Sequence, residues 1–172
     1  MKRMICLMLV LSLVLGVCPA AFAAEADATP EVDILTEDLT RSDKWPTTFK
    51  DISKTSYQGE IKNISVGYGI YTNYYFNCNS SGKLRVEATL TSGAPGYGSS
   101  KCKIEIYDAV SRDLVASYDP GFESYSNTYI SRTFTGLTYG VGYVVRFVNA
   151  TSGAYGDGDS YGLHGSITVK WP

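Results

Sequence analysis

The sequence predicts an all-β protein, an antiparallel β-sandwich of jelly-roll type with about eight strands. From Tyr57 onward, short runs of alternating apolar and polar residues are separated by Gly, Asn, Asp and Ser, a pattern typical of sandwiches and barrels. The runs show no helical period, and a closed barrel is the alternative fold. The predicted strands are residues 60–65, 74–78, 83–91, 101–106, 114–118, 128–134, 140–149 and 165–171.

The run at 83–91 alternates most regularly, which predicts one buried and one solvated face because successive strand side chains point to opposite sides. Its apolar face consists of Leu84, Val86, Ala88 and Leu90. The run at 101–106 repeats the pattern and places Cys102 on the inward face with Ile104 and Ile106. Apolar residues on both faces of 140–149 indicate a central strand, and residues 108–113 are expected to form a hairpin loop.

Residues 1–23 have the features of a secretory signal peptide. Lys2 and Arg3 precede an apolar run at 5–17, and Ala21-Phe22-Ala23 has the small-x-small pattern of a cleavage site. We therefore expect a secreted, extracellular protein with no membrane span after cleavage. A retained membrane anchor is one alternative, although the run is shorter than a typical span. Lipid attachment at Cys18 is another.

Cleavage would leave 149 of the 172 residues, the usual size of one domain. Residues 24–50 are acidic and lack a period, which predicts a flexible leader before a β-sandwich domain at 51–172. Trp45 is the exception in this leader. A large aromatic side chain at the edge of a polar segment is expected to dock on the following domain, with a ligand platform as the alternative.

The charge balance and the cysteine content narrow the possible classes of protein further. The chain has 15 basic and 17 acidic residues, and without Lys2 and Arg3 the balance becomes 13 to 17, a net charge of −4. This balance argues against a nucleic-acid partner. Cys78 and Cys102 remain after cleavage and are predicted to form a disulfide, with two buried free thiols as the alternative.

Several motifs resemble those of one known family. They are Tyr-Tyr-Phe at 74–76, Ser-Gly-Lys-Leu-Arg-Val at 81–86, Lys-Ile-Glu-Ile-Tyr-Asp at 103–108, Leu-Val-Ala at 114–116, Gly-Tyr-Val-Val-Arg-Phe at 142–147 and Gly-Ser-Ile-Thr-Val at 165–169. Their order resembles the bacterial pre-peptidase C-terminal domain, a jelly-roll module of secreted enzymes. The resemblance implies a freestanding accessory or ligand-binding domain. It does not carry over that family's calcium site, because residues 71–74 here read Tyr-Thr-Asn-Tyr.

The candidates for catalysis and metal binding are few. His164 is the single histidine of the sequence and lies in a predicted loop, so we expect no histidine-dependent nucleophile and no enzyme activity. Asp157 and Asp159 alternate with glycines at 153–162, where they form a candidate calcium site together with Asn149. A plain turn is the alternative reading, because Asp-Gly pairs are ordinary turn formers. No other cofactor is expected.

Tyrosine is abundant, with 14 in the chain. Because aromatic rings with a polar tip suit sugar faces and protein interfaces, the Gly-rich tyrosines are candidate ligand-binding residues. They are Tyr68, Tyr71, Tyr97, Tyr155 and Tyr161. The expected function is a non-catalytic binding or accessory module for extracellular carbohydrate or protein. The alternatives are a structural or interaction protein of the cell surface and a small carboxylate-based glycosidase.

Overall fold

A computed structural model describes residues 32–36, 44–92, 101–121, 127–151 and 162–172. The predicted signal peptide lies outside the described residues, as do the candidate site residues Tyr97, Tyr155, Asp157, Asp159 and Tyr161. The described residues from Val32 onward belong to one compact unit, Glu31–Pro172. Among the described segments, none is a helix with the length and apolar character needed to cross a membrane.

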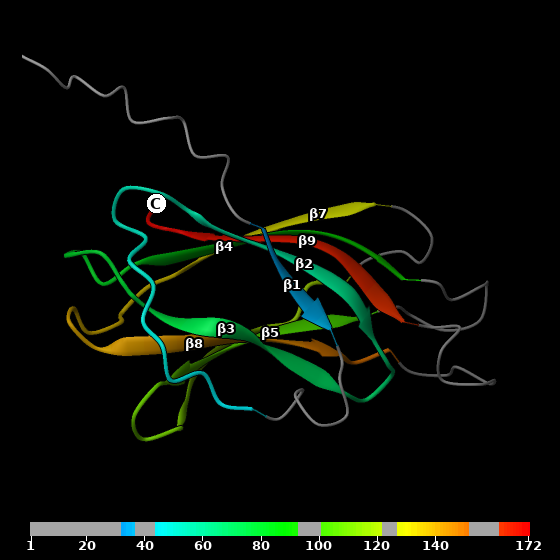
Figure 1. The fold of residues 1–172 in the computed structure, drawn as a ribbon, viewed down its shortest axis with the longest axis horizontal. Coiled ribbons are helices and arrows are strands. Elements are labelled where there is room, and N and C mark those ends of the chain that lie inside the picture. Colours follow the sequence, from blue (N-terminus) through cyan, green and yellow to red (C-terminus); the bar gives the residue numbers. More distant parts are fainter. Residues whose placement is uncertain (1–31, 37–43, 93–100, 122–126, 152–161) are drawn as a thin grey trace, which may run out of the picture. The chain divides into compact units, whose positions relative to one another are not determined.

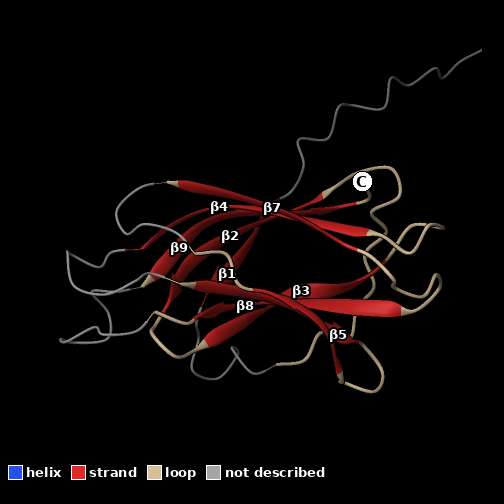
Figure 2. Cartoon of the chain, turned by 180° about the vertical axis from the view of Figure 1, so that it is seen from behind, coloured by secondary structure: helices blue, strands red, loops and turns tan. Residues whose placement is uncertain are grey.

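The described residues of this unit form nine strands in two stacked sheets (Figures 1 and 2). The strands are β1 (Val32–Thr36), β2 (Tyr57–Ile64), β3 (Gly69–Asn77), β4 (Leu84–Ser92), β5 (Cys102–Asp108), β6 (Leu114–Tyr118), β7 (Thr128–Phe134), β8 (Gly142–Asn149) and β9 (Leu163–Lys170). The first sheet, sheet A, has the order β1-β2-β9-β4-β7. The second, sheet B, has the order β3-β8-β5-β6.

The connectivity from β2 to β9 is that of a jelly roll. Successive strands alternate between sheets A and B except at the β5–β6 hairpin, and β2 pairs antiparallel with β9. The predicted fold class is therefore confirmed, and all eight predicted strands are present. The predicted hairpin loop is also confirmed, since the Asp108 amide donates to the Asp113 carbonyl at 3.0 Å.

The hydrophobic core lies between the two sheets. Along β4, buried and partly exposed residues alternate without interruption, as the sequence predicts. In β5, the side chains of Cys102, Ile104 and Ile106 are all buried. The central position of β8 between β3 and β5 explains why Val144 and Val145, which point to opposite faces, are both buried.

The N-terminal edge of sheet A differs from the prediction. Residues 32–36, inside the segment expected to be a flexible leader, form β1, which pairs with β2 in parallel. Leu35 is buried in the core, whereas its neighbour Ile34 is 55% exposed. The prediction of a flexible leader is therefore wrong for these five residues. A five-residue strand gives too short an alternation to stand out beside acidic residues, and its parallel pairing leaves no hairpin signal.

Replacing Leu35 with alanine tests whether β1 is an integral strand. We expect Leu35→Ala to lower the free energy of unfolding by about 2 kcal/mol, because it leaves a cavity among buried side chains. The matched control Ile34→Ala removes a mostly exposed side chain from the same strand and should change stability by less than about 0.5 kcal/mol. Urea unfolding measures both. Equal effects of the two variants would mean that β1 does not pack on the core.

The predicted disulfide is wrong, because Cys78 and Cys102 are buried free thiols. Cys78 follows Asn77, which pairs with Gly142 at the start of β8, whereas Cys102 pairs with Asn149 at its end. Gly142 and Asn149 are seven residue steps apart along β8, about 23 Å. A disulfide needs Cα atoms within about 7 Å of each other. Burial raises the pKa of Cys102 to about 12, so this thiol stays protonated at neutral pH.

Candidate functional site

Residues 44–50, which we call the strap, run along the outer face and edge of sheet B. Phe49 bridges Tyr75 of β3 in the parallel direction. The Tyr75 amide donates to the Thr48 carbonyl at 3.0 Å, and the Lys50 amide donates to the Tyr75 carbonyl at 3.1 Å. The strap is thus hydrogen-bonded to the edge strand, although the sequence predicted it to be part of the flexible leader.

Trp45 anchors the strap on the outer face of sheet B. Its Nε1–H donates to the Ala109 carbonyl at 2.9 Å. Its ring makes edge contacts with Tyr71 and Tyr107, at centroid distances of 5.2 and 6.0 Å. The Arg112 guanidinium lies 5.3 Å from the Trp45 ring centroid. The expected docking of Trp45 is confirmed, and these contacts hold its ring in one orientation.

A paired polar cluster lies beside Trp45 on the same face of the sheet. The Glu105 carboxylate, 7% exposed, contacts Lys103 at 2.8 Å and Arg146 at 3.2 Å. It also accepts a hydrogen bond from the Tyr107 hydroxyl at 2.8 Å. Burial acts to raise the pKa of Glu105, but the hydrogen bonds from Lys103 and Tyr107 outweigh it and hold the pKa below its usual value. Because the Glu105 carboxylate is paired with side chains of the same sheet, we interpret the cluster as structural.

A groove of about 630 Å³ opens between the strap, the end of β3, the hairpin loop after β5 and the start of β8. We call it the aromatic groove, because Trp45, Phe49 and Tyr75 line it together with Asn77 and Arg112. Phe49 is 43% exposed, and its ring centroid lies 5.6 Å from that of Tyr75. The volume falls within the range of small-molecule sites.

A second hollow of about 250 Å³ continues from the aromatic groove and shares Phe49 and Asn77 with it. Tyr139 and Trp171 complete its aromatic lining. The Trp171 Nε1–H donates to the Asn77 carbonyl at 2.8 Å, so the C-terminal residues hold the end of β3 in place. The two hollows together bring five aromatic residues to this end of the sandwich: Trp45, Phe49, Tyr75, Tyr139 and Trp171.

The predicted tyrosine platform does not assemble from its described members. Tyr68 is exposed, and its carbonyl accepts the Asn149 amide at 2.9 Å, which places it at the end of β8 opposite to the aromatic groove. Tyr71 is half-buried under Trp45, with the Arg146 guanidinium 5.3 Å from its ring centroid. The aromatic groove instead uses Phe49 and Tyr75, which were not predicted as site residues.

The remaining candidate residues that the structure describes have structural or surface positions. Asn149 is fully buried, its Nδ2 donates to the Ile64 carbonyl at 2.8 Å, and its Oδ1 accepts the Thr151 amide at 3.2 Å. His164 is exposed on β9 opposite Thr91. Within the described ranges, no three His, Cys, Asp or Glu side chains gather as metal ligands would. Asp157 and Asp159 lie outside those ranges.

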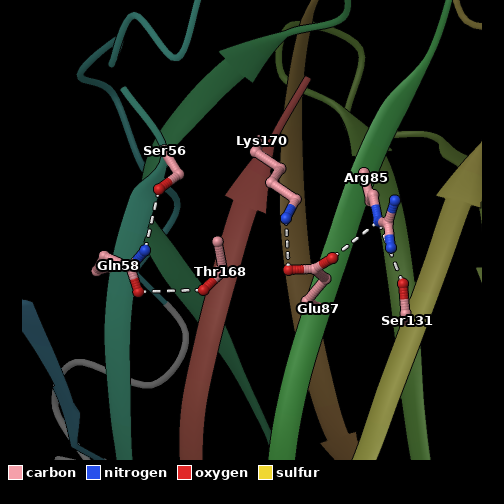
Figure 3. Close-up of polar contacts among 7 residues, drawn as sticks. All are labelled: Ser56, Gln58, Arg85, Glu87, Ser131, Thr168 and Lys170. Atoms are coloured by element: carbon pink, nitrogen blue, oxygen red, sulfur yellow. Dashed lines mark hydrogen bonds and ion pairs between the residues drawn. The ribbon is translucent and has the colours of Figure 1, made fainter. Parts of the chain in front are cut away.

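The outer face of sheet A offers a contrast with the aromatic groove (Figure 3). There Glu87 contacts Lys170 at 2.7 Å and Arg85 at 2.8 Å, and Thr168 donates to Gln58 at 3.1 Å. The hydrogen bond from Lys170 lowers the pKa of Glu87 most, against a smaller effect of burial. These polar side chains are therefore already partnered with one another, within β4 and across neighbouring strands, without a ligand.

Comparison with known proteins finds no matching family model and no matching curated protein. Among solved structures, the chain is similar to the CBM22-1 and GH10 modules of Clostridium thermocellum endo-1,4-β-D-xylanase 10B complexed with xylohexaose, at 11% identity and a TM-score of 0.39. That match covers 68% of this chain and 25% of the xylanase chain, so the chain spans about a quarter of it.

A second similar structure is the carbohydrate-binding module CBM6cm-2 from Cellvibrio mixtus lichenase 5A in complex with cellotriose. The identity is 12% and the TM-score 0.39, over 68% of this chain and 87% of that chain. Both likenesses are too distant to assign a ligand to the aromatic groove. The β-sandwich of this chain is established by its own two sheets.

Proposed function

We propose that the chain is a secreted, non-catalytic binding module whose aromatic groove takes a saccharide. The observation that carries the proposal is the partly exposed ring of Phe49 beside Tyr75 and the anchored Trp45, in a groove that Asn77 also lines. A sugar ring has an apolar face and a rim of hydroxyl groups. Aromatic rings can stack on that face while polar side chains at the groove edge bind the hydroxyls.

The lining of the aromatic groove favours binding over hydrolysis. Hydrolysis of a glycosidic bond usually requires two carboxyl groups at a defined separation on either side of that bond. None of the described residues that line the groove is Asp or Glu. Glu87 and Glu105, elsewhere on the two sheets, are held in ion pairs. The glycosidase alternative therefore gains no support from this groove.

Saccharide binding is tested by removing the most accessible ring of the groove. We expect the secreted protein to bind oligosaccharides saturably on a glycan array and in calorimetric titrations. Phe49→Ala should weaken that affinity about tenfold, since one aromatic stacking contact contributes about 1.5 kcal/mol.

Tyr129→Ala is the matched control, because Tyr129 is 61% exposed but lies on β7 of sheet A. This variant should bind as the unmodified protein does. An unmodified protein that retains no oligosaccharide would refute the proposed function. An equal loss in the two variants would move the site away from the aromatic groove.

A further inference from the structure

Arg112 occupies a backbone position that the hairpin loop fixes. Its φ is 64°, a left-handed conformation that costs a non-glycine residue about 1 kcal/mol. Its amide donates to the Asp108 carbonyl at 3.0 Å. The Asp108 carboxylate in turn accepts the amides of Val110 and Ser111 at 2.8 and 2.9 Å. The direction in which the Arg112 side chain leaves the loop is therefore set by a hydrogen-bonded turn.

The guanidinium of Arg112 gives the aromatic groove a positive charge. Arg112 is the only charged residue among the described residues that line the groove. None of the ion pairs between described residues includes it, and the nearby Asp108 uses its Oδ1 to hold the loop. The Arg112 guanidinium lies 5.3 Å from the Trp45 ring centroid, and no hydrogen bond between described residues uses its N–H groups, so these groups can donate to a ligand.

We infer that the aromatic groove recognises an acidic saccharide, with the carboxylate of a uronic acid unit bound by Arg112. This inference rests on the proposed function and names its ligand class. A guanidinium matches a carboxylate with two parallel hydrogen bonds, and its stacked position reduces the freedom lost on binding. The sugar ring that carries the carboxylate would lie on Phe49 or Tyr75, which line the same groove.

The test compares an oligouronate with the same oligosaccharide after its carboxyl groups are reduced to alcohols. We expect the unmodified protein to bind the oligouronate about tenfold more tightly, since one charge-assisted bidentate pair contributes about one factor of ten. Arg112→Gln should abolish that preference while its affinity for the reduced oligosaccharide stays the same. Arg112→Lys should keep part of the preference, because it keeps the charge and loses the planar fork.

Arg132→Gln is the matched control, because the Arg132 guanidinium also stacks on an aromatic ring, 4.9 Å from the centroid of Tyr118, outside the groove. Arg132→Gln should leave the preference for the oligouronate over the reduced oligosaccharide unchanged. Equal affinity of the unmodified protein for the two oligosaccharides would overturn the inference and leave the proposed function standing. A preference that survives Arg112→Gln would also overturn it. Arg112-dependent binding of an acidic peptide, with no oligosaccharide bound, would overturn both.

Discussion

Replacing Gly165 with alanine is expected to lower the free energy of unfolding by about 4 kcal/mol, from backbone strain and steric overlap together. Gly165 has a φ of 146°, which side chains rarely adopt. A Cβ atom there would lie 2.0 Å from the Thr89 carbonyl oxygen and 3.0 Å from the Leu90 Cα. Because β9 is paired with β2 on one side and β4 on the other, neither strand can move away without breaking its ladder.

Gly136→Ala separates the contribution of backbone strain from that of steric overlap. Gly136 also has a positive φ, 77°, but apart from its chain neighbours no atom of the described residues would lie within 4 Å of a Cβ at this position. Gly136→Ala should therefore lower the free energy of unfolding only through backbone strain, by about 1 kcal/mol. Urea unfolding of the two variants gives the difference directly. If Gly165→Ala cost no more than Gly136→Ala, the close approach of β9 to β4 would not be a feature of the folded protein.

The strand pattern of the fold was predictable because most strands have one buried and one exposed face. Where the alternation of buried and exposed residues is broken, the predicted strand is shorter than the observed one. The sequence predicts a strand from Tyr74, whereas β3 begins at Gly69, because the register shifts between Tyr71 and Tyr75 and breaks the alternation. β1 was missed for a related reason, since it is short and its partner is parallel.

The predicted disulfide shows what alternation cannot supply. The alternation of apolar and polar residues identifies the face of the sheet on which a side chain lies, and the predicted placement of Cys102 on the inward face is confirmed. It does not say at which end of the sheet that residue is found. Only the register of β3 and β5 against β8 shows that Cys78 and Cys102 lie at opposite ends of sheet B.

The candidate site was predictable only at one residue. Trp45 stood out as a large aromatic residue in a polar segment. Phe49 lies four residues after Trp45 and is also an aromatic residue in a polar segment, although its side chain is smaller. Tyr75 and Arg112 come from other segments, and the sequence contains nothing that joins them to Trp45, because their convergence depends on the strap crossing sheet B.

Replacing Glu105 with alanine is expected to lower the free energy of unfolding by about 3 kcal/mol at pH 7, because it leaves a partly buried charge unpaired. Arg146, whose side chain is only 25% exposed, would lose its ion pair, and its Nε already has no hydrogen-bond partner among the described residues. The matched control Glu60→Ala removes a carboxylate from the exposed pair with Lys62 and should cost less than about 1 kcal/mol.

The acid dependence of stability should change with the same residue. The pKa of Glu105 is lowered in the folded protein, so its contribution is fully present above the ordinary glutamate value of about 4.3 and is lost as the pH falls through the lower folded value. Glu105→Gln has no carboxylate at this position to protonate. Its urea midpoint should therefore fall less between pH 6 and pH 3 than that of the unmodified protein. A parallel fall in the two proteins would show that the Glu105 carboxylate gains nothing from Lys103, Tyr107 and Arg146.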